Sequence, residues 1–258
     1  MRCFFNQVIV VAVFLTHTNV LFAQESSSKF SWRNIQHKVS IGYNIGATAP
    51  FSLPNTIRKI KSYSPLFTPS LGYEATYELS NAWRVGTGLR IESKGMRVTD
   101  SVQYFHTIIS VNNGGGDDGG SFEGDFTGTN ETKSLQTYLT LPVFASYRFH
   151  KWDIKVGAYA SRLLSSSFEG SVSDGYIRKG NSLGEKVWID RATFDFADQV
   201  RKWDWGLLVG GTRKIDDRWE VSALAQLGLQ PLFPDDFRGV GYKLHHMYVN
   251  LGGTYRFW

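Results

Sequence analysis

The final stretch of the chain, Met247–Trp258, alternates between two kinds of side chain. One set is Met247, Val249, Leu251, Gly253, Tyr255 and Phe257, and the other is Tyr248, Asn250, Gly252, Thr254 and Arg256. A period of two indicates a β-strand with one apolar and one polar face. The strand ends on aromatic residues, which is typical of a transmembrane barrel, where such side chains gather at the membrane interface. For this stretch alone, an ordinary strand of a soluble sandwich is the alternative.

Seven earlier segments alternate in the same way. They are Lys38–Thr48, Phe67–Leu79, Trp83–Lys94, Leu135–Phe149, Trp152–Arg162, Trp203–Ile215 and Trp219–Leu229. Each is close to the roughly 9–11 residues that a tilted strand needs to cross a bilayer. With the last strand they predict an all-β fold, an eight-stranded antiparallel up-and-down transmembrane β-barrel. Pro142 has no backbone N–H for the strand ladder, so it predicts a bulge or a local break.

The connections between these segments alternate in length. The short ones are Ser80–Ala82, His150–Lys151 and Asp216–Asp217, and the long ones are Pro50–Pro65, Gly95–Lys133, Leu164–Arg201 and Pro231–Leu244. Outer-membrane barrels have short periplasmic turns and long extracellular loops, so we expect periplasmic chain termini and long extracellular loops. Val102–Val111 is expected to extend a strand beyond the membrane. The Gly- and Asp-rich Asn112–Gly120 is expected to be a mobile tip, and its acids lack the spacing of a calcium loop.

Tryptophan follows each short turn, at Trp83, Trp152 and Trp219. A barrel carries a girdle of aromatic residues at each membrane interface. We therefore predict a periplasmic aromatic belt made of Trp83, Trp152, Trp219, Phe257 and Trp258, to which Tyr77 and Phe149 also belong.

The polar face carries charges of both signs that nearly cancel. The acids are Glu74, Glu78, Glu92, Asp153, Asp204 and Glu220, and the bases are Lys38, Arg84, Arg90, Lys94, Arg148, Lys155 and Arg256. Because buried charges need partners, we predict a lumen charge network of Glu74, Glu78, Arg84, Arg90, Glu92, Arg148, Asp153, Lys155, Asp204, Glu220 and Arg256. In it, the four arginines are expected to reach Glu74, Glu92 or Glu220. Such a filling predicts a plugged lumen, since eight strands enclose little space.

Alternation alone does not tell which face is outside. A soluble periplasmic ligand-binding barrel alternates too, with its apolar set inside. The tryptophans after the turns, the asymmetry of the connections and the aromatic terminus favour the membrane barrel.

The beginning of the chain indicates export. Arg2 precedes the apolar stretch Val8–Leu15, which is too short to span a bilayer, and Leu21–Ala23 suits a cleavage site. We expect a signal peptide over 1–23, cleaved near Ala23, a flexible periplasmic lead-in over 24–36, and an outer-membrane β-barrel over 37–258 of a Gram-negative cell. Expected partners are outer-membrane lipid and, through the C-terminal strand, the barrel-assembly machinery. The one cysteine, Cys3, would be removed with the signal peptide.

No catalytic, cofactor-binding or metal-binding residue emerges from the sequence. His245 and His246 are adjacent, so on a strand their rings point apart and do not easily share a metal. No run of like charges exceeds three residues, which gives no footprint for nucleic acid. The expectation is a protein that is not an enzyme, and an outer-membrane lipid-modifying enzyme is a rival because serine is abundant in the loops.

Three stretches resemble a known family. Thr137–Val143, Lys202–Val209 and Asn250–Phe257 are similar to the outer-membrane β-barrel proteins of Bacteroidetes-type bacteria, a family that includes PorT-like proteins. The resemblance covers Lys38–Trp258 and implies an eight-stranded outer-membrane barrel, some of whose PorT-like members assist a protein-secretion system. The predicted function is therefore a non-enzymatic outer-membrane barrel whose loops act in surface binding, adhesion or assembly, with an unknown extracellular or secretion partner.

Overall fold

The computed structural model describes residues 34–110 and 121–257. The expected signal peptide, residues 24–33 of the expected lead-in, the tip Asn112–Gly120 and the belt residue Trp258 lie outside the described residues. The first strand begins at Ile35, so residues 35 and 36 of the expected lead-in belong to it. None of the described residues belongs to a helix that is long and apolar enough to cross a membrane.

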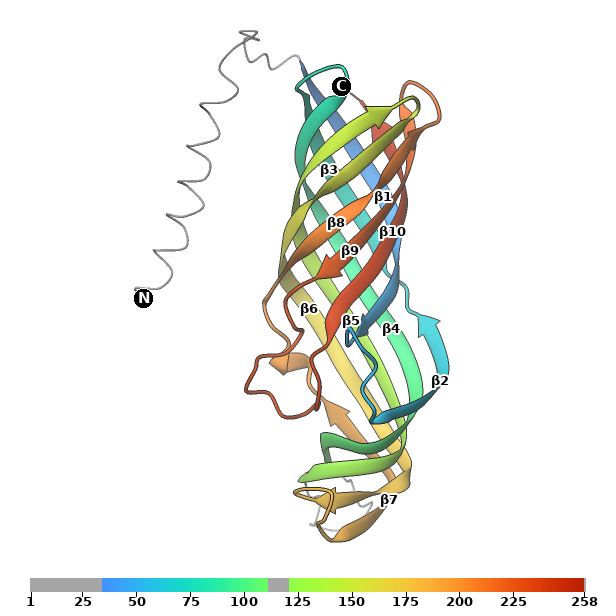
Figure 1. The fold of residues 1–258 in the computed structure, drawn as a ribbon, viewed down its shortest axis with the longest axis vertical. Helices are drawn as coiled ribbons and strands as arrows, with labels where there is room; N and C mark the ends of the chain where they lie inside the picture. Colours follow the sequence, from blue (N-terminus) through green and yellow to red (C-terminus); the bar gives the residue numbers. More distant parts are fainter. Residues whose placement is uncertain (1–33, 111–120, 258) are drawn as a thin grey trace, which may run out of the picture. The chain divides into compact units, whose positions relative to one another are not determined.

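One antiparallel sheet of ten strands makes up the described residues. The strands are β1 (Ile35–Ala49), β2 (Ile57–Pro65), β3 (Pro69–Glu78), β4 (Trp83–Ser110), β5 (Ser121–Phe149), β6 (Trp152–Lys179), β7 (Lys186–Asp195), β8 (Trp203–Lys214), β9 (Trp219–Gly228) and β10 (His245–Arg256), with the 3-10 helix η3 (Ala197–Gln199) after β7. Eight of them pair in a closed ring in the order β1, β3, β4, β5, β6, β8, β9, β10 and back to β1 (Figure 1). The ring strands contain the alternating segments of the sequence.

The long connections differ from the prediction. Within Gly95–Lys133, Val102–Val111 is expected to extend a strand, and β4 does continue to Ser110, but β5 also occupies Ser121–Lys133, which was not expected. Leu164–Arg201 continues β6 and adds β7 and η3. Pro50–Pro65 contains β2, which pairs with the far part of β4 where β3 has ended. Register shifts in β2, β4 and β6 interrupt the alternation of side chains in these stretches, so their sequence does not show the regular period of a strand.

A second compartment lies beyond the ring, at the end away from the described chain termini (Figure 1). We call it the distal compartment and define it as β2, β7, η3, residues 229–244 and the far parts of β4, β5 and β6, that is 96–110, 121–134 and 164–179. It has its own apolar core, in which side chains from the strands, from residues 229–244 and from Phe196 and Val200 on either side of η3 pack together. The fully buried members include Ile109, Phe126, Val172 and Ile177.

Three bulges change which residues point inward along the long strands. β6 carries an extra residue at Leu164 and another near Asp174, and β4 carries one near Tyr104. Asp174 and Tyr104 have φ values of 52° and 55°, in the left-handed region. Along β6 the buried residues are Asp153, Lys155, Tyr159 and Ser161, then Phe168 and Val172, then Gly175 and Ile177. Each bulge shifts the inward set by one residue, and the interior changes from charged to apolar.

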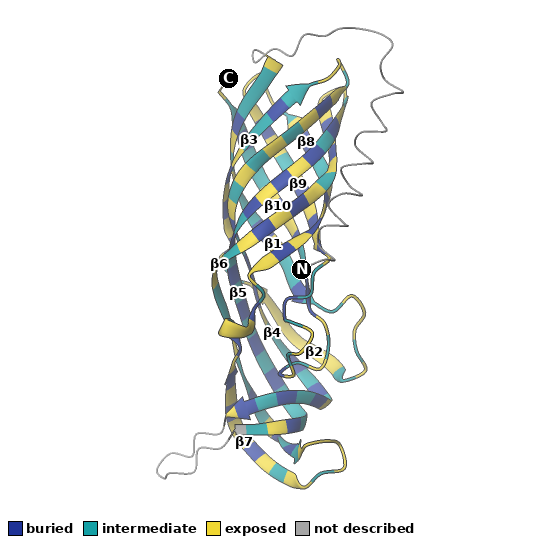
Figure 2. Cartoon of the chain, turned by 90° about the vertical axis from the view of Figure 1, so that its left-hand side faces the viewer, coloured by how far each residue is buried: buried dark blue, intermediate teal, exposed yellow. Residues whose placement is uncertain are grey.

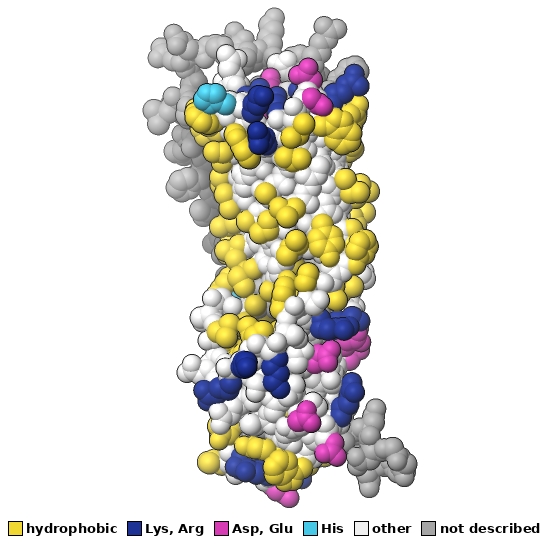
Figure 3. All heavy atoms as spheres, turned by 90° about the vertical axis from the view of Figure 1, so that its right-hand side faces the viewer, with side chains coloured by type: hydrophobic (Ala, Val, Ile, Leu, Met, Phe, Trp, Pro, Cys, Tyr) yellow, Lys and Arg dark blue, Asp and Glu magenta, His cyan; other side chains and the backbone are white. Residues whose placement is uncertain are grey.

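The apolar face of the ring is on the outside. Among its exposed members are Val39, Ile41, Leu71, Val85, Leu89, Ile91, Leu141, Val143, Ile154, Val156, Leu207, Val209, Val221 and Leu251. Figure 2 shows exposed and buried residues alternating along the ring strands, and Figure 3 shows hydrophobic side chains over the barrel wall with charged ones toward its ends. A soluble ligand-binding barrel would place this set inside, so that alternative is wrong.

Side chains of the short turns hold two of the predicted belt tryptophans in place. Ser80 Oγ accepts a hydrogen bond from the backbone N–H of Trp83 at 3.0 Å. Asp216 Oδ1 accepts one from the N–H of Trp219 at 2.7 Å. These hydrogen bonds fix the backbone at the first residue of the next strand. They thereby set the position from which the tryptophan side chain extends.

Pro142 lies in the interior of β5, where it interrupts the ladder without a register shift. Thr87 pairs with Val143 and Arg90 with Thr140, while the two β4 residues between them are unpaired with β5. The Thr87 hydroxyl donates to the Pro142 carbonyl at 2.9 Å, which satisfies that oxygen. The predicted local break is therefore present, and the predicted alternative of a bulge is not.

Phe126→Ala should loosen the distal compartment and leave the ring folded. Phe126 is fully buried, and Cβ atoms placed on Gly128 and Gly175 would lie 2.5 Å and 2.8 Å from its ring. Its removal leaves a cavity that costs about 3–5 kcal/mol of unfolding free energy. Limited proteolysis of the purified protein in micelles should cut the distal compartment faster, while the heat-modifiable gel mobility of the barrel is kept. Leu183→Ala, at a residue 90% exposed, is the control. Equal cleavage rates for both variants would contradict this account of the core.

Candidate functional site

The inside of the ring is crossed by ion pairs between buried side chains. Lys38 on β1 lies 2.9 Å and 3.0 Å from the two carboxylate oxygens of Glu220 on β9. The two side chains are 2% and 3% exposed. The strand β10 lies between the two strands that carry this pair. The two side chains can therefore meet only because the ring is curved and its strands are in this register.

Near the short turns, two arginines and two acids form a cluster. Arg84 Nη1 lies 2.7 Å from Asp153 Oδ2, and its Nε lies 3.1 Å from Glu78 Oε1. Arg148 approaches the same two acids, with distances of 3.2 Å to Asp153 and 3.7 Å to Glu78. Every charge in this cluster has neighbours of the opposite sign, which offsets the cost of burying it.

Near the end of the ring that adjoins the distal compartment, Lys94 is held by one acid and two aromatic rings. Its Nζ lies 3.2 Å from Asp204 Oδ2, and the Tyr159 hydroxyl donates to the same oxygen at 3.0 Å. The ammonium lies 4.7 Å from the centre of the Tyr159 ring and 5.3 Å from that of Tyr138. Cation–π attraction thus adds to the ion pair in a place without solvent.

Glu92 is fully buried and has polar partners on three sides. Arg90 Nη1 lies 3.5 Å from its carboxylate, Thr140 donates to it at 2.9 Å, and Gln226 donates at 3.2 Å. These partners come from β4, β5 and β9, so the carboxylate ties opposite walls of the barrel together.

Lys155 and Glu74 form a further pair, 2.7 Å apart, and Lys155 Nζ lies 4.6 Å from the centre of the Phe144 ring. Phe144 has room because glycines face it. A Cβ on Gly86 would lie 2.5 Å from its ring, and one on Gly157 would lie 2.7 Å from its own Cβ. Small residues opposite large ones let the interior fill without voids.

The predicted partners of the arginines were mostly different. Glu220 is paired with Lys38 and Glu74 with Lys155, and of the arginines only Arg90 contacts one of the expected acids, Glu92. Arg256 has no ion-pair partner among the described residues, and its guanidinium instead donates to the backbone carbonyl of Asp217 in a short turn. The structure thus places it outside the charge cluster.

Lys38 and Lys94 were not among the predicted network residues, although each pairs with one of its acids. Both lie in the polar set of an alternating segment, so the same pattern that singled out the arginines marked them too.

The predicted belt residues lie exposed at the turn end of the ring. Trp83, Trp152, Trp219 and Phe257 are each about half exposed. Trp83 packs edge-on against Tyr147 with ring centres 5.1 Å apart, and Trp219 lies 5.0 Å from Tyr255. Sequence reasoning missed a group of exposed aromatic residues near the other end of the apolar face, Phe67, Trp203 and Trp205, although alternation already put Trp203 and Trp205 on that face.

On the distal side of the charges, His246 links the Tyr138 and Thr48 hydroxyl groups in a chain of hydrogen bonds. The Tyr138 hydroxyl and His246 Nε2 are 2.9 Å apart, and His246 Nδ1 is 2.9 Å from the Thr48 hydroxyl, which also contacts Tyr248 at 3.2 Å. His245 Nδ1 instead contacts the Gly228 carbonyl at 3.0 Å. The two adjacent histidines thus have separate partners. Residues 34–110 and 121–257 hold no group of three or more acid, histidine or cysteine side chains placed for a metal ion.

The distal compartment carries an exposed aromatic pair at the β6–β7 hairpin. Trp188 on β7 is 75% exposed and packs edge-on against its cross-strand neighbour Tyr176, with ring centres 5.6 Å apart. Lys186 Nζ lies 4.6 Å from the centre of the Tyr176 ring. An exposed, preformed aromatic surface beside a cation is the kind of anchor that dominates binding interfaces.

Lys38→Met should destabilise the barrel by about 3–5 kcal/mol, because it leaves the buried Glu220 carboxylate without a partner. Adding Glu220→Gln to this variant should restore much of the loss, since the uncompensated charge is then gone. Urea unfolding in micelles, followed by tryptophan fluorescence, measures both effects. Lys179→Met breaks the exposed pair with Glu185 and should cost less than about 1 kcal/mol. Equal effects of the two lysine substitutions would count against a buried lumen pair.

Solved structures that resemble this chain share little sequence with it. The crystal structure of Ail, the attachment invasion locus protein of Yersinia pestis, is 13% identical and covers 86% of this chain and 98% of its own, with a TM-score of 0.34. Neisserial surface protein A is 10% identical and covers 87% of this chain and 97% of its own, with a TM-score of 0.31. Likenesses this weak carry no argument about function. No curated protein matches the chain.

The family comparison covers most of the molecule. The family described as outer membrane protein beta-barrel domain matches residues 22–234, which include ring strands β1, β3, β4, β5, β6, β8 and β9. This match agrees with the closed ring, its apolar outer face and its charged interior, and it gives the outer membrane as the location. The chain belongs to the outer membrane protein beta-barrel domain family.

Proposed function

We propose that this protein is a non-enzymatic outer-membrane barrel with a plugged lumen, which binds a partner outside the cell through its distal compartment. The eight ring strands cross the membrane in this proposal, with the three short turns and both chain ends in the periplasm. Long connections on the other side are typical of the extracellular face of such barrels. The distal compartment therefore faces the surroundings of the cell.

The exposed hairpin surface of Trp188 and Tyr176 carries the binding part of the proposal. Trp188 is 75% exposed although it packs against Tyr176, so most of its indole is available to a partner. Binding hot spots are enriched in tryptophan and tyrosine held rigidly, as the two paired strands hold these. The partner is expected to stack on the indole and to meet the nearby Lys186 ammonium.

The plugged lumen rests on how the interior is filled. The buried ion pairs, the Phe144 ring and the hydrogen bonds of His246 lie inside the ring, and the apolar core of the distal compartment lies beyond them. An eight-stranded ring is narrow enough for side chains to fill it. Solute passage would require these pairs to open, and opening a buried pair exposes charges that have no other partner.

Export and assembly complete the proposal. The signal peptide over 1–23 directs the chain across the inner membrane, and the C-terminal strand β10 (His245–Arg256) engages the barrel-assembly machinery. The stretches Thr137–Val143, Lys202–Val209 and Asn250–Phe257 support a PorT-like member of the family, for which a partner in protein secretion is one form of the surface binding proposed here.

The purified protein should not form large channels. Planar-bilayer recording should show a closed or barely conducting state, because the charges inside the ring are paired and buried. A wide barrel protein known to conduct, reconstituted in the same way, is the positive control. Stable, large, ohmic currents from the wild type would overturn the plugged lumen and would move the function to passive diffusion of solutes.

Trp188→Ala should weaken adhesion of cells that display the protein, by the equivalent of 2 kcal/mol or more if Trp188 is a binding hot spot, roughly a 30-fold loss of affinity. Adhesion of a heterologous Gram-negative host to a panel of cells and matrix surfaces measures this. Tyr104→Ala is the matched control, because Tyr104 is an exposed aromatic residue of the distal compartment outside the β6–β7 hairpin. The idea fails if both variants, displayed at equal levels, adhere like the wild type, or if the wild type adheres to nothing that cells without it do not.

A further inference from the structure

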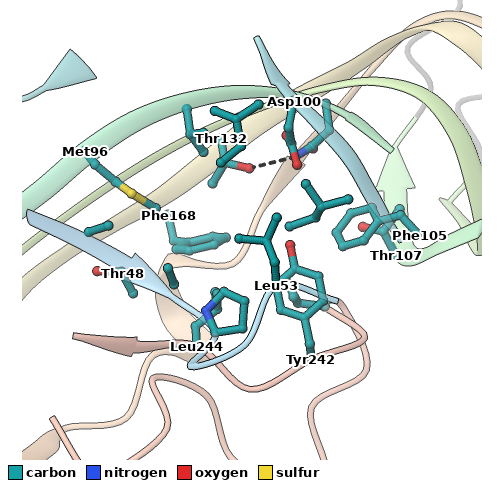
Figure 4. A pocket seen from close by; sticks show the side chains of 18 of the residues that line it. Thr48, Leu53, Met96, Asp100, Phe105, Thr107, Thr132, Phe168, Tyr242 and Leu244 are labelled. Carbon is teal, nitrogen blue, oxygen red and sulfur yellow. Dashed lines mark hydrogen bonds between the residues drawn. The ribbon is translucent and has the colours of Figure 1, made fainter. Parts of the chain in front are cut away.

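A cavity of about 190 Å³ lies at the boundary between the ring and the distal compartment. Its walls come from the end of β1, the segment that leads into β2, the far part of β4, and the segment before β10 (Figure 4). The lining is mostly apolar and includes Met96, Phe105, Phe168 and Leu244. Leu53, Ile60 and Tyr63 also line it and are 60%, 50% and 45% exposed, so the cavity is accessible from outside on that side.

One wall of this apolar cavity is polar. Asp100, on β4, is 3% exposed, and its Oδ1 accepts a hydrogen bond from Asn130 Nδ2 at 2.8 Å. Among the described residues Asp100 has no ion-pair partner, and burial raises the pKa of its carboxyl group. Lys61, whose charge acts on it, donates instead to the Thr129 hydroxyl at 2.8 Å. A buried acid without a cation is unusual in a protein whose other buried acids are paired.

Two further buried oxygen atoms in the cavity wall have no hydrogen-bond partner within the described residues. They are Asn130 Oδ1 and Thr107 Oγ1, on residues that are 3% and 0% exposed. Figure 4 shows the Tyr242 hydroxyl directed into the cavity between these walls. Buried polar atoms are nearly always satisfied, so unpaired acceptors beside an open apolar space point to a missing donor.

We propose that this cavity binds a small apolar molecule that carries a primary ammonium group. An ammonium has three N–H donors and no acceptor. The wall offers it the Asp100 carboxylate and the neighbouring Asn130 carbonyl oxygen, and its charge neutralises the buried acid. The apolar part of the ligand lies against Phe105, Phe168 and Leu244.

The size of the cavity limits the ligand. A buried apolar cavity of about 150 Å³ holds benzene. The 190 Å³ here therefore suit one aromatic ring or a chain of similar volume together with the ammonium group. A carboxylate of the same shape meets the like charge of Asp100, and a plain hydrocarbon leaves the acceptors unpaired, so the site discriminates by the charge of the head group.

Three probes of one shape test this proposal on the full-length protein in micelles: 2-phenylethylamine, ethylbenzene and phenylacetate. Ligand-observed NMR with concentration series gives the affinities. We expect 2-phenylethylamine to bind at least tenfold more tightly than ethylbenzene and phenylacetate not to bind. Asp100→Asn should remove the preference for the amine and keep ethylbenzene binding, whereas Asp190→Asn, at an exposed β7 residue, should change nothing.

Two more variants cover the case in which Asp100→Asn fails to fold. Asn130→Ala removes the neighbouring acceptor without changing charge and should weaken only the amine. Leu53→Trp fills the entrance and should abolish binding of the amine and of ethylbenzene. Amine affinity that is unchanged in Leu53→Trp, or a wild type that binds the three probes equally or not at all, would overturn the proposal. None of these outcomes depends on Trp188, so the adhesion proposal stands or fails separately.

Discussion

The ion pair between Lys38 and Glu220 shows the constraint on which the ring depends. Once the apolar face meets lipid, every charge of the other face is inside a narrow space, where it needs a partner of opposite sign. Lys38 finds its partner two strands away along the ring, across β10. Such pairs form only if the curvature, tilt and register of the strands agree around the whole ring. The pairing of the interior charges therefore depends on the closure of the barrel.

The interior of the distal compartment is also filled with side chains, but these are apolar and not charged. Water surrounds it, so its outer face carries charges and its inner face holds the apolar core around Ile109, Phe126 and Val172. β4, β5 and β6 pass through both environments without ending. Between the two interiors lie the hydrogen bonds of His246 and the cavity at Asp100, where a polar group and apolar side chains share one wall.

Strict alternation made the ring strands, the outward tryptophans and the inward charges predictable from sequence. The extension of β4 past Val102 was also predicted, but the far part of β6 was missed because the bulges at Leu164 and Asp174 break the period of two. The partner of each individual charge could not be predicted from the sequence, for another reason. Which acid a lysine reaches depends on the stagger of the strands around the barrel, which no single segment contains. The Asp100 cavity escaped too, because residues 47–63, 96–107 and 240–244 meet there only in the fold.

The bulge at Leu164 has a consequence for how this protein can vary. Leu164 has no matching residue on β5, so the inward-facing residues of β6 are odd-numbered before the bulge and even-numbered directly after it. If β6 kept all its residues but paired with β5 without the bulge, Phe168 and Val172 would turn toward water and Glu169 and Ser171 would enter the apolar core. Loss of Leu164 would instead place Ser165 directly after Leu163 in the ladder and leave these directions unchanged. The bulge therefore lets β6 carry one residue more than its partner strand while its apolar side chains stay inside.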